Sequence, residues 1–183
     1  MRNVEDVIRQ TAPKRPILIK STISIKGWDH IISETPEKEI CFSPEFLRAN
    51  TAVGDLKVQK EILMGGKGVD FWTNIFDCDI VVADPRALVI AKYFRNAFLA
   101  TKVNFFNQIF DLCEKLNLNY EDVRKYVAQD SRIGDSHTMV TDERGFGGHC
   151  FPKDVQALLK TAEEQGIELS LIKEANEYNK KIK

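Results

Sequence analysis

Hydrophobic and polar residues alternate in short blocks over the first 84 residues, and the blocks predict strands separated by helices. Four apolar runs have the length of strands: 15–24, 39–46, 61–66 and 78–84. Two segments between them, 27–34 and 68–76, carry apolar residues at helical spacing. Strands that alternate with helices are typical of a parallel α/β layer.

From Pro85 onward the pattern becomes helical. Residues 85–116 contain no further proline and no glycine, and their apolar positions recur at helical spacing. Proline favours the first turn of a helix, so we expect one long helix here, acting as a domain spine or a dimer seam. Further helices are predicted for 120–130, 152–166 and 169–183, with a loop over 130–151. The expected fold is therefore α/β, with a partial parallel sheet (1–84) followed by an all-helical domain (85–183).

Composition narrows the possible partners and location. A net charge of -1 leaves no basic excess to neutralise phosphates, which argues against nucleic acid as the main partner. No apolar run approaches the roughly 18 residues that span a bilayer, and the first residues have no apolar signal segment. The four cysteines form no CxxC pair. We therefore expect reduced thiols, a cytoplasmic location and no structural zinc.

The stretch "GFGGHCFPKD" (145–154) carries the strongest chemical signal. Pro152 fits the first turn of a helix, which places Cys150 just before a helix N-terminus. Unpaired N–H groups and the helix dipole stabilise a thiolate there, and glycines allow a substrate to approach the backbone closely. These features predict an activated nucleophile. The competing interpretation is a glycine-rich turn with an incidental cysteine.

Other candidates each have an ordinary structural alternative. Lys92 and Asn96 share a helix face and could stabilise an oxyanion, or they could form a solvated face. Glu45 follows a strand, where a carboxylate could activate water or simply face solvent. Arg132 could fork onto a hydroxyl or phosphate, or form a surface ion pair. His149 lies next to Cys150, but no fourth ligand is evident, so no metal site is expected.

In chain order, "IKST", "PEFLR", "KYFRNAFLATK", "DSRIG" and "GFGGHCFPKD" closely resemble the UDP-glucose/GDP-mannose dehydrogenase family. The resemblance covers almost the whole chain. The phenylalanine in "CFPKD" resembles the UDP-glucose branch, whereas leucine is frequent there in the GDP-mannose branch. The closing "EANEYNKKIK" is similar to the family's helix before its last domain.

This resemblance implies a Rossmann-like first domain and a four-electron oxidation of a sugar C6 alcohol to a carboxylate. NAD takes two hydrides in turn, and the cysteine forms a thiohemiacetal and then a thioester that is hydrolysed. The long helix 85–116 matches the family's dimer core, so the resemblance implies a homodimer and a UDP-sugar substrate.

The resemblance also implies roles for individual residues. Cys150 matches the nucleophile, Lys92 and Asn96 match the pair that steadies oxyanion and water, and Asp154 matches an aspartate that positions water. Glu45 matches the loop carboxylate used in acid–base work. The remaining matches concern ligand binding: Thr22 near water and nicotinamide, Lys153 near the cofactor, Arg132 reaching the sugar from a neighbouring subunit, and Phe46, Leu47 and Gly147 around the substrate.

The chain departs from the family pattern at both nucleotide-binding parts. It contains no GxGxxG turn, and the glycine cluster at 65–68 lacks the required spacing. Ala49 stands where the family has a glutamate that contacts the cofactor, and Asn50 replaces a glycine. We expect a protein truncated at both ends relative to the family, with its chemical centre retained and poor NAD affinity on its own.

Three functional hypotheses follow. The chain is a dehydrogenase part that works with a separate chain supplying the missing nucleotide-binding domains. Alternatively, it is a reduced dehydrogenase-like protein with weak or no turnover. The third hypothesis is a dimerising module that binds relatives or a nucleotide sugar without catalysis.

Overall fold

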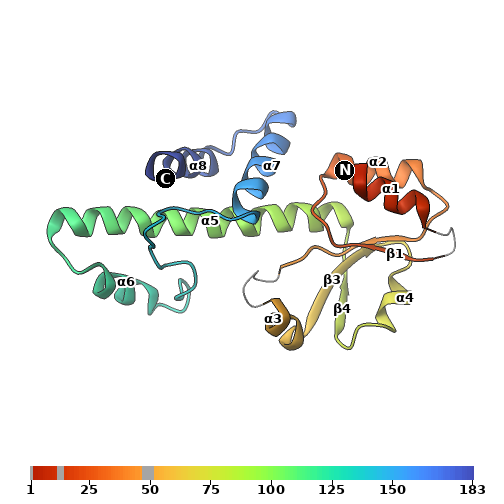
Figure 1. The fold of residues 1–183 in the computed structure, drawn as a ribbon, viewed down its shortest axis with the longest axis horizontal. Coiled ribbons are helices and arrows are strands. Elements are labelled where there is room, and N and C mark those ends of the chain that lie inside the picture. The colour runs from red at the N-terminus through yellow and green to blue at the C-terminus, as the bar shows by residue number, and fades with distance from the viewer. Residues whose placement is uncertain (1, 12–14, 47–51) are drawn as a thin grey trace. The chain divides into compact units, whose positions relative to one another are not determined.

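The computed structural model describes residues 2–11, 15–46 and 52–183 (Figure 1). The chain divides into two compact units, residues 1–92 and 93–183, each described below by itself. The predicted border at residue 84 coincides with the start of a long helix, and the two units meet within that helix. The domains 1–84 and 85–183 therefore stay a prediction.

The described residues form eight helices and four strands (Figure 1). The first unit contains α1 (Arg2–Gln10), β1 (Ile17–Ile19), α2 (Ile25–Glu34), β2 (Ile40–Phe42), α3 (Ala52–Val58), β3 (Glu61–Gly66), α4 (Val69–Thr73) and β4 (Asp79–Val82). The chain then continues through α5 (Pro85–Leu116), α6 (Tyr120–Ala128), α7 (Cys150–Glu164) and α8 (Ser170–Ile182).

The four strands form one sheet in the order β1-β2-β3-β4. The pairs β1/β2 and β3/β4 are parallel, with Ile17 opposite Ile40 and Glu61 opposite Asp79. All four predicted strands are confirmed, as is the partial sheet that follows from them. One antiparallel pair, β2/β3, was not predicted from the sequence.

Glycine explains this antiparallel contact. A Cβ on Gly66 would lie 2.3 Å from the carbonyl oxygen of Ile40, and a Cβ on Gly65 would lie 1.9 Å from the carbonyl oxygen of Ala83. Only residues without a side chain allow the backbones to approach so closely. Gly66 also has a φ of 112°, which L-residues rarely adopt.

Helices α1 and α2 complete the core of the first unit. The Ser24 hydroxyl caps α2 by accepting a 3.0 Å hydrogen bond from the Gly27 amide, and Trp28 and Ile31 are buried. Helix α1 was not predicted. Buried Lys38 donates hydrogen bonds to the carbonyl oxygens of Ile8 and Thr11, so a cation lies at the C-terminal end of α1.

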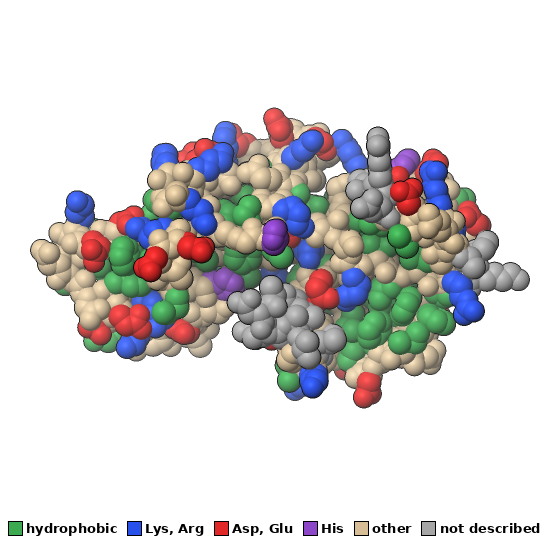
Figure 2. Space-filling model, viewed as in Figure 1, with side chains coloured by type: hydrophobic (Ala, Val, Ile, Leu, Met, Phe, Trp, Pro, Cys, Tyr) green, Lys and Arg blue, Asp and Glu red, His purple; other side chains and the backbone are tan. Residues whose placement is uncertain are grey.

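Strand β4 is an edge of the described sheet and exposes apolar side chains. Figure 2 shows hydrophobic side chains gathered over α4 and β4. The exposed members are Phe71, Ile75, Val81 and Val82. Strand β1 forms the opposite edge. Such edges can be covered by further polypeptide.

The second unit is helical, as predicted. Figure 1 shows α7 and α8 on one side of α5 and α6 on the other. Helix α5 starts at Pro85 and ends at Leu116, as the sequence predicts. Asn117 follows in the left-handed conformation (φ 53°), and the Leu118 amide donates to the Cys113 carbonyl at 2.9 Å. These two features are those of a Schellman motif, which explains the sharp end of the helix.

Helix α7 begins two residues earlier than the sequence suggested. Cys150 is its first residue rather than the residue before its first turn, and the preceding His149 already has helical backbone angles. Pro152 still lies in the first turn, where its missing N–H costs no hydrogen bond. Among the described residues, no helix is both long and apolar enough to cross a membrane.

Candidate functional site

In the first unit, Thr22 and Glu45 follow the ends of neighbouring strands. Strands β1 and β2 are parallel, so the loops that leave their carboxyl ends start at the same edge of the sheet. The Ser43 amide donates to the Ile19 carbonyl at 3.0 Å and extends this pairing by one step. Thr22 and Glu45 are both half-buried. The structure therefore places these two predicted site residues at one edge of the sheet.

Lys92, in the third turn of α5, reaches the loop that follows the carboxyl end of β2. Its Nζ donates to the Glu45 carbonyl at 2.5 Å and lies 5.9 Å from the centre of the Phe46 ring. Only 7% of Lys92 is exposed, so its ammonium is largely desolvated. Glu45 Oε2 also pairs with Lys20 at 3.3 Å. Two cations thus lie near the Glu45–Phe46 segment, and Lys20 was not predicted as a site residue.

Two sequence predictions in this segment fall outside the described residues. Leu47, predicted to contact substrate, and Ala49, which replaces a family glutamate, both lie in 47–51. Ser43, which precedes the segment, was not singled out from the sequence. It is fully buried, and its hydroxyl has no hydrogen-bond partner within the part of the chain that the structure describes.

In the second unit, Asn96 and Asp154 form the central polar pair. Asn96 Nδ2 on α5 donates to Asp154 Oδ2 on α7 at 2.6 Å, and Asp154 is completely buried. Cys150 and Asp154 are four residues apart on α7, so they share one helix face. The structure therefore brings together the predicted Asn96 and Asp154 and sets the predicted nucleophile one turn away.

The second oxygen of Asp154 is poorly satisfied. Lys153 Nζ lies 2.9 Å from Asp154 Oδ1, close enough for an ion pair. That approach lacks hydrogen-bond geometry, so Oδ1 has no hydrogen-bond donor among the described residues. Neighbouring Tyr93 is also buried, and burial together with the Asp154 charge raises the pKa of its phenol. A buried carboxylate oxygen with spare acceptor capacity is suited to orient a water molecule.

Cys150 is the one exposed thiol of the four cysteines, and it lies at the N-terminus of a 15-residue helix. Cys41 and Cys113 are buried, and Cys78 is half-buried. Burial, with a smaller contribution from the Glu39 charge, raises the pKa of the Cys41 thiol to about 11. Cys150 is therefore accessible to solvent, whereas the other three thiols are partly or fully buried by packing.

Two of the three glycines before Cys150 adopt left-handed backbone angles. Gly145 has a φ of 56° and Gly148 a φ of 72°, whereas Gly147 lies outside that region. Phe146 between them is buried and packs edge-to-face on Phe151, with ring centres 6.5 Å apart. The two rings lie on either side of Cys150 in the sequence and fix the chain before and after it.

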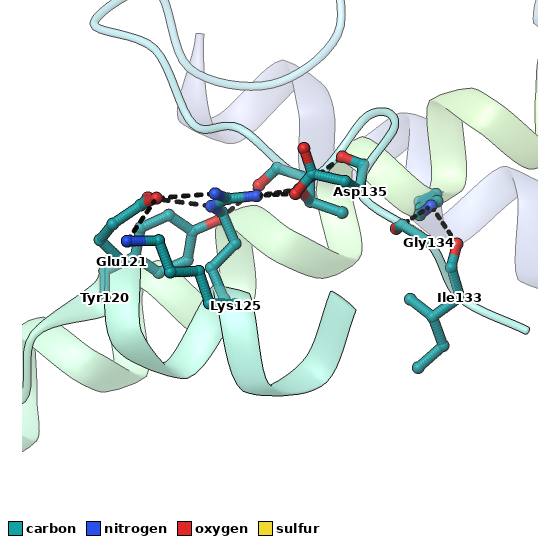
Figure 3. Close-up of polar contacts among 9 residues, drawn as sticks. Tyr120, Glu121, Lys125, Ile133, Gly134 and Asp135 are labelled. Atoms are coloured by element: carbon teal, nitrogen blue, oxygen red, sulfur yellow. Dashed lines mark hydrogen bonds and ion pairs between the residues drawn. The ribbon is translucent and has the colours of Figure 1, made fainter. Parts of the chain in front are cut away.

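The loop that carries Arg132 is held by polar contacts, and Figure 3 shows those around Glu121, Ile133, Gly134 and Asp135. Arg124 is buried and donates to Glu121, Asp135 and the Thr138 hydroxyl. Lys102 of α5 donates to the carbonyl oxygens of Ile133 and Gly134 at 2.7 and 3.0 Å.

Arg132 itself points outward from this loop. Its side chain is 87% exposed and pairs with Asp130 at 2.6 Å, which holds the pKa of that carboxyl below its ordinary value. The structure places Arg132 on the surface of the second unit, in a loop that is fixed from both ends. Its predicted contact with a sugar stays a prediction.

Sequence analysis missed the side chains that hold the glycine loop. Asn107 and Asn179 are buried and hydrogen-bond to the backbone of residues 145 and 146. A signal existed, because both asparagines occur at positions where a helix otherwise buries apolar residues. A buried amide in such a position must find partners, and here the partners are loop backbone groups.

The described residues contain no group of three or more histidine, cysteine, aspartate or glutamate side chains placed to hold a metal ion. The polar groups found are instead an exposed thiol, a buried carboxylate with an amide partner, and buried or half-buried ammonium groups. Within the second unit, the thiol is suited to attack a carbonyl carbon and the buried carboxylate is suited to orient a water molecule.

Comparison with known proteins identifies the family to which this chain belongs. The family model described as "UDP-glucose/GDP-mannose dehydrogenase family, central domain" matches residues 88–181, about half of the chain. The chain belongs to the UDP-glucose/GDP-mannose dehydrogenase family. The family resemblance predicted from the motifs is confirmed.

Individual relatives agree with this assignment. The chain is 36% identical over 177 residues to a UDP-glucose 6-dehydrogenase of Rickettsia felis, covering 90% of this chain and 39% of that protein. It is 36% identical over 196 residues to a UDP-glucose 6-dehydrogenase of Campylobacter jejuni, covering 99% and 49%. The chain thus spans two fifths to half of the length of these relatives.

A solved structure supports the fold. The UDP-glucose dehydrogenase from the archaeon Pyrobaculum islandicum superposes with a TM-score of 0.77 and 29% sequence identity, covering 90% of this chain and 41% of that chain. The expected fold class, a partial Rossmann-like sheet followed by helices with a long central helix, is confirmed.

The family uses NAD, but the glycines at 65, 66 and 68 of the described residues do not form the turn that would bind its pyrophosphate. Gly65 and Gly66 are the last two residues of strand β3, where a Cβ would clash with neighbouring backbone. Gly68 faces the Glu39 side chain, and helix α4 has only five residues. The described residues therefore contain no phosphate-binding turn for a pyrophosphate.

Proposed function

We propose that this chain provides the catalytic centre of an NAD-dependent UDP-glucose 6-dehydrogenase. The observation that carries the proposal is the exposed Cys150 at the start of α7, one turn before the buried Asp154 that accepts a hydrogen bond from Asn96. Family membership and the "CFPKD" sequence support UDP-glucose as the nucleotide sugar.

The proposed overall reaction balances as a four-electron oxidation. A C6 alcohol, one water and two NAD⁺ give a carboxylate, two NADH and three protons. NAD supplies the oxidant by taking up one hydride in each of two steps. The chain described here supplies the nucleophile and the polar groups, and the pyrophosphate grip comes from further polypeptide, on the same chain or on a separate one.

Cys150 acts on the aldehyde formed by the first oxidation. Its thiolate forms a C–S bond to the aldehyde carbon, and the carbonyl oxygen becomes the hydroxyl of a thiohemiacetal by taking up one proton. Removal of a hydride from this carbon and of the hydroxyl proton leaves a thioester. Water then breaks the C–S bond, which releases the carboxylate and returns the thiolate to Cys150.

The remaining roles follow from charge and hydrogen-bonding capacity. The Lys92 ammonium and the Asn96 amide stabilise negative charge on oxygen as it develops. Asp154 orients the water that attacks the thioester, using the oxygen that lacks a hydrogen-bond donor. Glu45 exchanges the proton of the C6 hydroxyl, and Thr22 holds a water molecule.

The ligand-binding assignments stay within the same proposal. Phe46, Leu47 and Gly147 contact the sugar nucleotide, Arg132 reaches the substrate of a neighbouring copy, and Lys153 and Thr22 lie near the cofactor. A cytoplasmic location follows from the reduced thiols that the sequence suggests.

A combined binding and activity experiment tests the proposal. The purified chain is titrated calorimetrically with UDP-glucose and with NAD, and NADH formation is followed with and without the remaining domains of a relative. We expect weak NAD binding by the chain alone, NADH formation only in the combined sample, and no UDP-sugar carboxylate with Cys150→Ala, because the second oxidation needs the thiol. Carboxylate formation by the Cys150→Ala sample would contradict the proposal.

A second function is favoured by the apolar surface of α5. Large exposed apolar side chains lie along this helix, among them Phe94, Phe98 and Phe105. A dimerising module that binds a nucleotide sugar without turnover would need this surface and no phosphate-binding turn. Self-association together with UDP-glucose binding, but without NADH in any combination, would favour this function.

A further inference from the structure

The loop before Cys150 is held at one point by a buried asparagine of α8. Asn179 is 8% exposed, and its side chain meets both backbone groups of Phe146. The Phe146 amide donates to Asn179 Oδ1 at 2.7 Å, and Asn179 Nδ2 donates to the Phe146 carbonyl at 3.0 Å. One side chain thus pairs with the loop as a neighbouring strand would.

A second asparagine, from α5, holds the preceding residue. Asn107 is 1% exposed, and its Oδ1 accepts from the Gly145 amide at 3.1 Å and from Arg144 Nε at 2.8 Å. Its Nδ2 donates to the Val103 carbonyl of its own helix at 2.9 Å, which fixes the orientation of the amide. Both oxygen and nitrogen of Asn107 are therefore used.

Arg144 adds an ionic fastening to the same helix. Its Nη2 lies 2.5 Å from Asp111 Oδ1, and its guanidinium lies 4.8 Å from the centre of the Phe110 ring. The Tyr178 hydroxyl of α8 donates to the other oxygen of Asp111 at 2.8 Å. Helices α5 and α8 thus share one polar network, and residues 144–146 are its third member.

This network explains why residue 145 of the motif is a glycine. A Cβ on Gly145 would lie 2.3 Å from Asn179 Oδ1, and its φ of 56° suits glycine. Gly148 has a positive φ, but a Cβ there would meet nothing within 4 Å. Gly145 therefore serves the approach of the loop to α8, whereas Gly148 serves the turn into α7.

We propose that Asn179 and Asn107 are positioning residues that fix the glycine loop and, through it, the thiol of Cys150 at the start of α7. Phe146, the residue held by Asn179, lies four positions before Cys150 and packs on Phe151 just after it. Releasing Phe146 would loosen the first turn of α7, whose N–H groups stabilise a thiolate. This inference rests on the proposed role of Cys150 as nucleophile.

The test measures how fast iodoacetamide alkylates Cys150 across a range of pH, with Cys78 of the same chain as internal reference. The variant Asn179→Asp keeps an acceptor for the Phe146 amide and puts an oxygen against the Phe146 carbonyl. Asn107→Ala removes the second hold. Asn176→Asp is the matched control, because Asn176 is an equally buried asparagine of α8 that bonds Gln156 and Glu177 instead of the loop.

We expect Asn179→Asp and Asn107→Ala to slow Cys150 alkylation about three- to tenfold near neutral pH. The control should stay within about twofold of wild type. General loosening of the fold would instead raise labelling of the buried cysteines. Circular dichroism identifies any variant that does not fold. If one of the two loop variants fails to fold, the other one provides the test.

Hydrogen exchange of the Phe146 amide gives a second readout. Asn179→Asp should lower its protection at least about tenfold, and Asn176→Asp should not. Unchanged or faster Cys150 alkylation in both loop variants would overturn the positioning role. If wild-type Cys150 is no more reactive than Cys78, the proposed function fails. Selective loss of Phe146 protection in Asn179→Asp would then still support the hold on the loop.

Discussion

At the scale of single residues, the four cysteines differ in exposure: two are buried, one is half-buried and one is exposed. Cys150 is exposed at a helix N-terminus, whereas Cys41 is buried in the central strand β2 and donates a hydrogen bond to the Lys67 carbonyl at 3.0 Å. Alkylation requires both access and a thiolate. The two thiols therefore differ in both requirements.

This contrast predicts the order of labelling. Iodoacetamide at neutral pH should label Cys150 first and Cys41 last, because a pKa of about 11 leaves Cys41 with about 100-fold less thiolate than a thiol at the ordinary 9.0. Peptide mass mapping of the folded chain measures the order. Labelling of Cys41 or Cys113 before Cys150 would contradict the packing described here.

Asp154 is a buried carboxylate that accepts a hydrogen bond from the Asn96 amide and forms an ion pair with Lys153. Replacement of Asp154 by alanine leaves Nδ2 of half-buried Asn96 without this acceptor, and an unsatisfied donor costs about 1–3 kcal/mol when it is buried. We expect the free energy of unfolding to fall by this amount in urea titrations. Asn96→Ala should cost a similar amount, because it removes the hydrogen bond that the buried carboxylate accepts.

The double variant sharpens this prediction. Because both residues serve the same hydrogen bond, Asp154→Ala with Asn96→Ala should cost less than the sum of the two single changes. Simple additivity would show that the two side chains do not depend on each other. The replacement Lys153→Ala is a suitable comparison, since Lys153 is half-exposed and its ion pair is worth little.

At the scale of elements, the loop 129–139 is fastened by one buried cation. Arg124 bonds Glu121 within α6 and Asp135 in the loop, and the Tyr120 hydroxyl donates to the Thr138 carbonyl at 2.5 Å. The hydrogen bond from Arg124 is the main cause that holds the pKa of Glu121 below its ordinary 4.5. The loop therefore depends on an ionised Glu121.

The sign of the pH dependence follows from this lowered pKa. The contribution of Glu121 is present above pH 4.5 and is lost as pH falls through its lower value in the folded chain. Protection of the loop amides, measured relative to their intrinsic exchange rate at each pH, should therefore fall below pH 4.5. In Glu121→Gln that change should be smaller. Equal acid sensitivity in both proteins would assign it to other carboxylates.

Single elements also show what could be predicted from sequence. Helix α5 was predictable at both ends, since Pro85 fits a first turn and Asn117 tolerates the left-handed angle after the last. Helix α1 was missed because it is short and depends on Lys38, which lies some thirty residues away. The antiparallel β2/β3 contact likewise depends on the β2 backbone at Ile40, which Gly66 meets only after folding.

Some residues of the candidate site could also be predicted from the sequence, and others could not. Cys150 and Asp154 belong to one continuous motif, so their shared helix face could be derived from spacing. Asn107 and Asn179 lie far from residues 145–146 in the sequence, and nothing local shows that their amides bond the loop backbone. Long-range hydrogen bonds of this kind become visible only when the helices are packed.

At the scale of the whole molecule, the exposed side of α5 has a regular pattern. Its exposed large apolar residues lie 4, 7, 7 and 4 positions apart: Phe94, Phe98, Phe105, Leu112 and Leu116. At 100° per residue these steps keep all five within a sector of about 40°, over a length of about 33 Å. A narrow stripe with heptad spacing is typical of a helix that packs along another helix.

A groove beside this stripe also has the features of a surface that binds another protein chain. A hollow of about 380 Å³ lies between α5 and α8, and its lining includes Phe105 and Leu171. Leu171 is 73% exposed, so the apolar surface continues from α5 onto α8. Glu174 and Lys181 also line the hollow and carry opposite charges about two turns apart on α8. A second copy in antiparallel orientation would pair these charges.

We therefore predict a homodimer through α5 whose strength depends on the stripe. Phe98 is 69% exposed, and burying a phenylalanine side chain contributes about 1.5–3 kcal/mol. Phe98→Glu in both copies should weaken the dimer by at least about tenfold in dissociation constant. Tyr126→Glu on α6 is the matched control, because Tyr126 is 68% exposed and lies outside the stripe. Sedimentation velocity over a range of concentrations separates the outcomes: a monomeric wild type, or equal weakening by both changes, would show that the stripe does not mediate self-association.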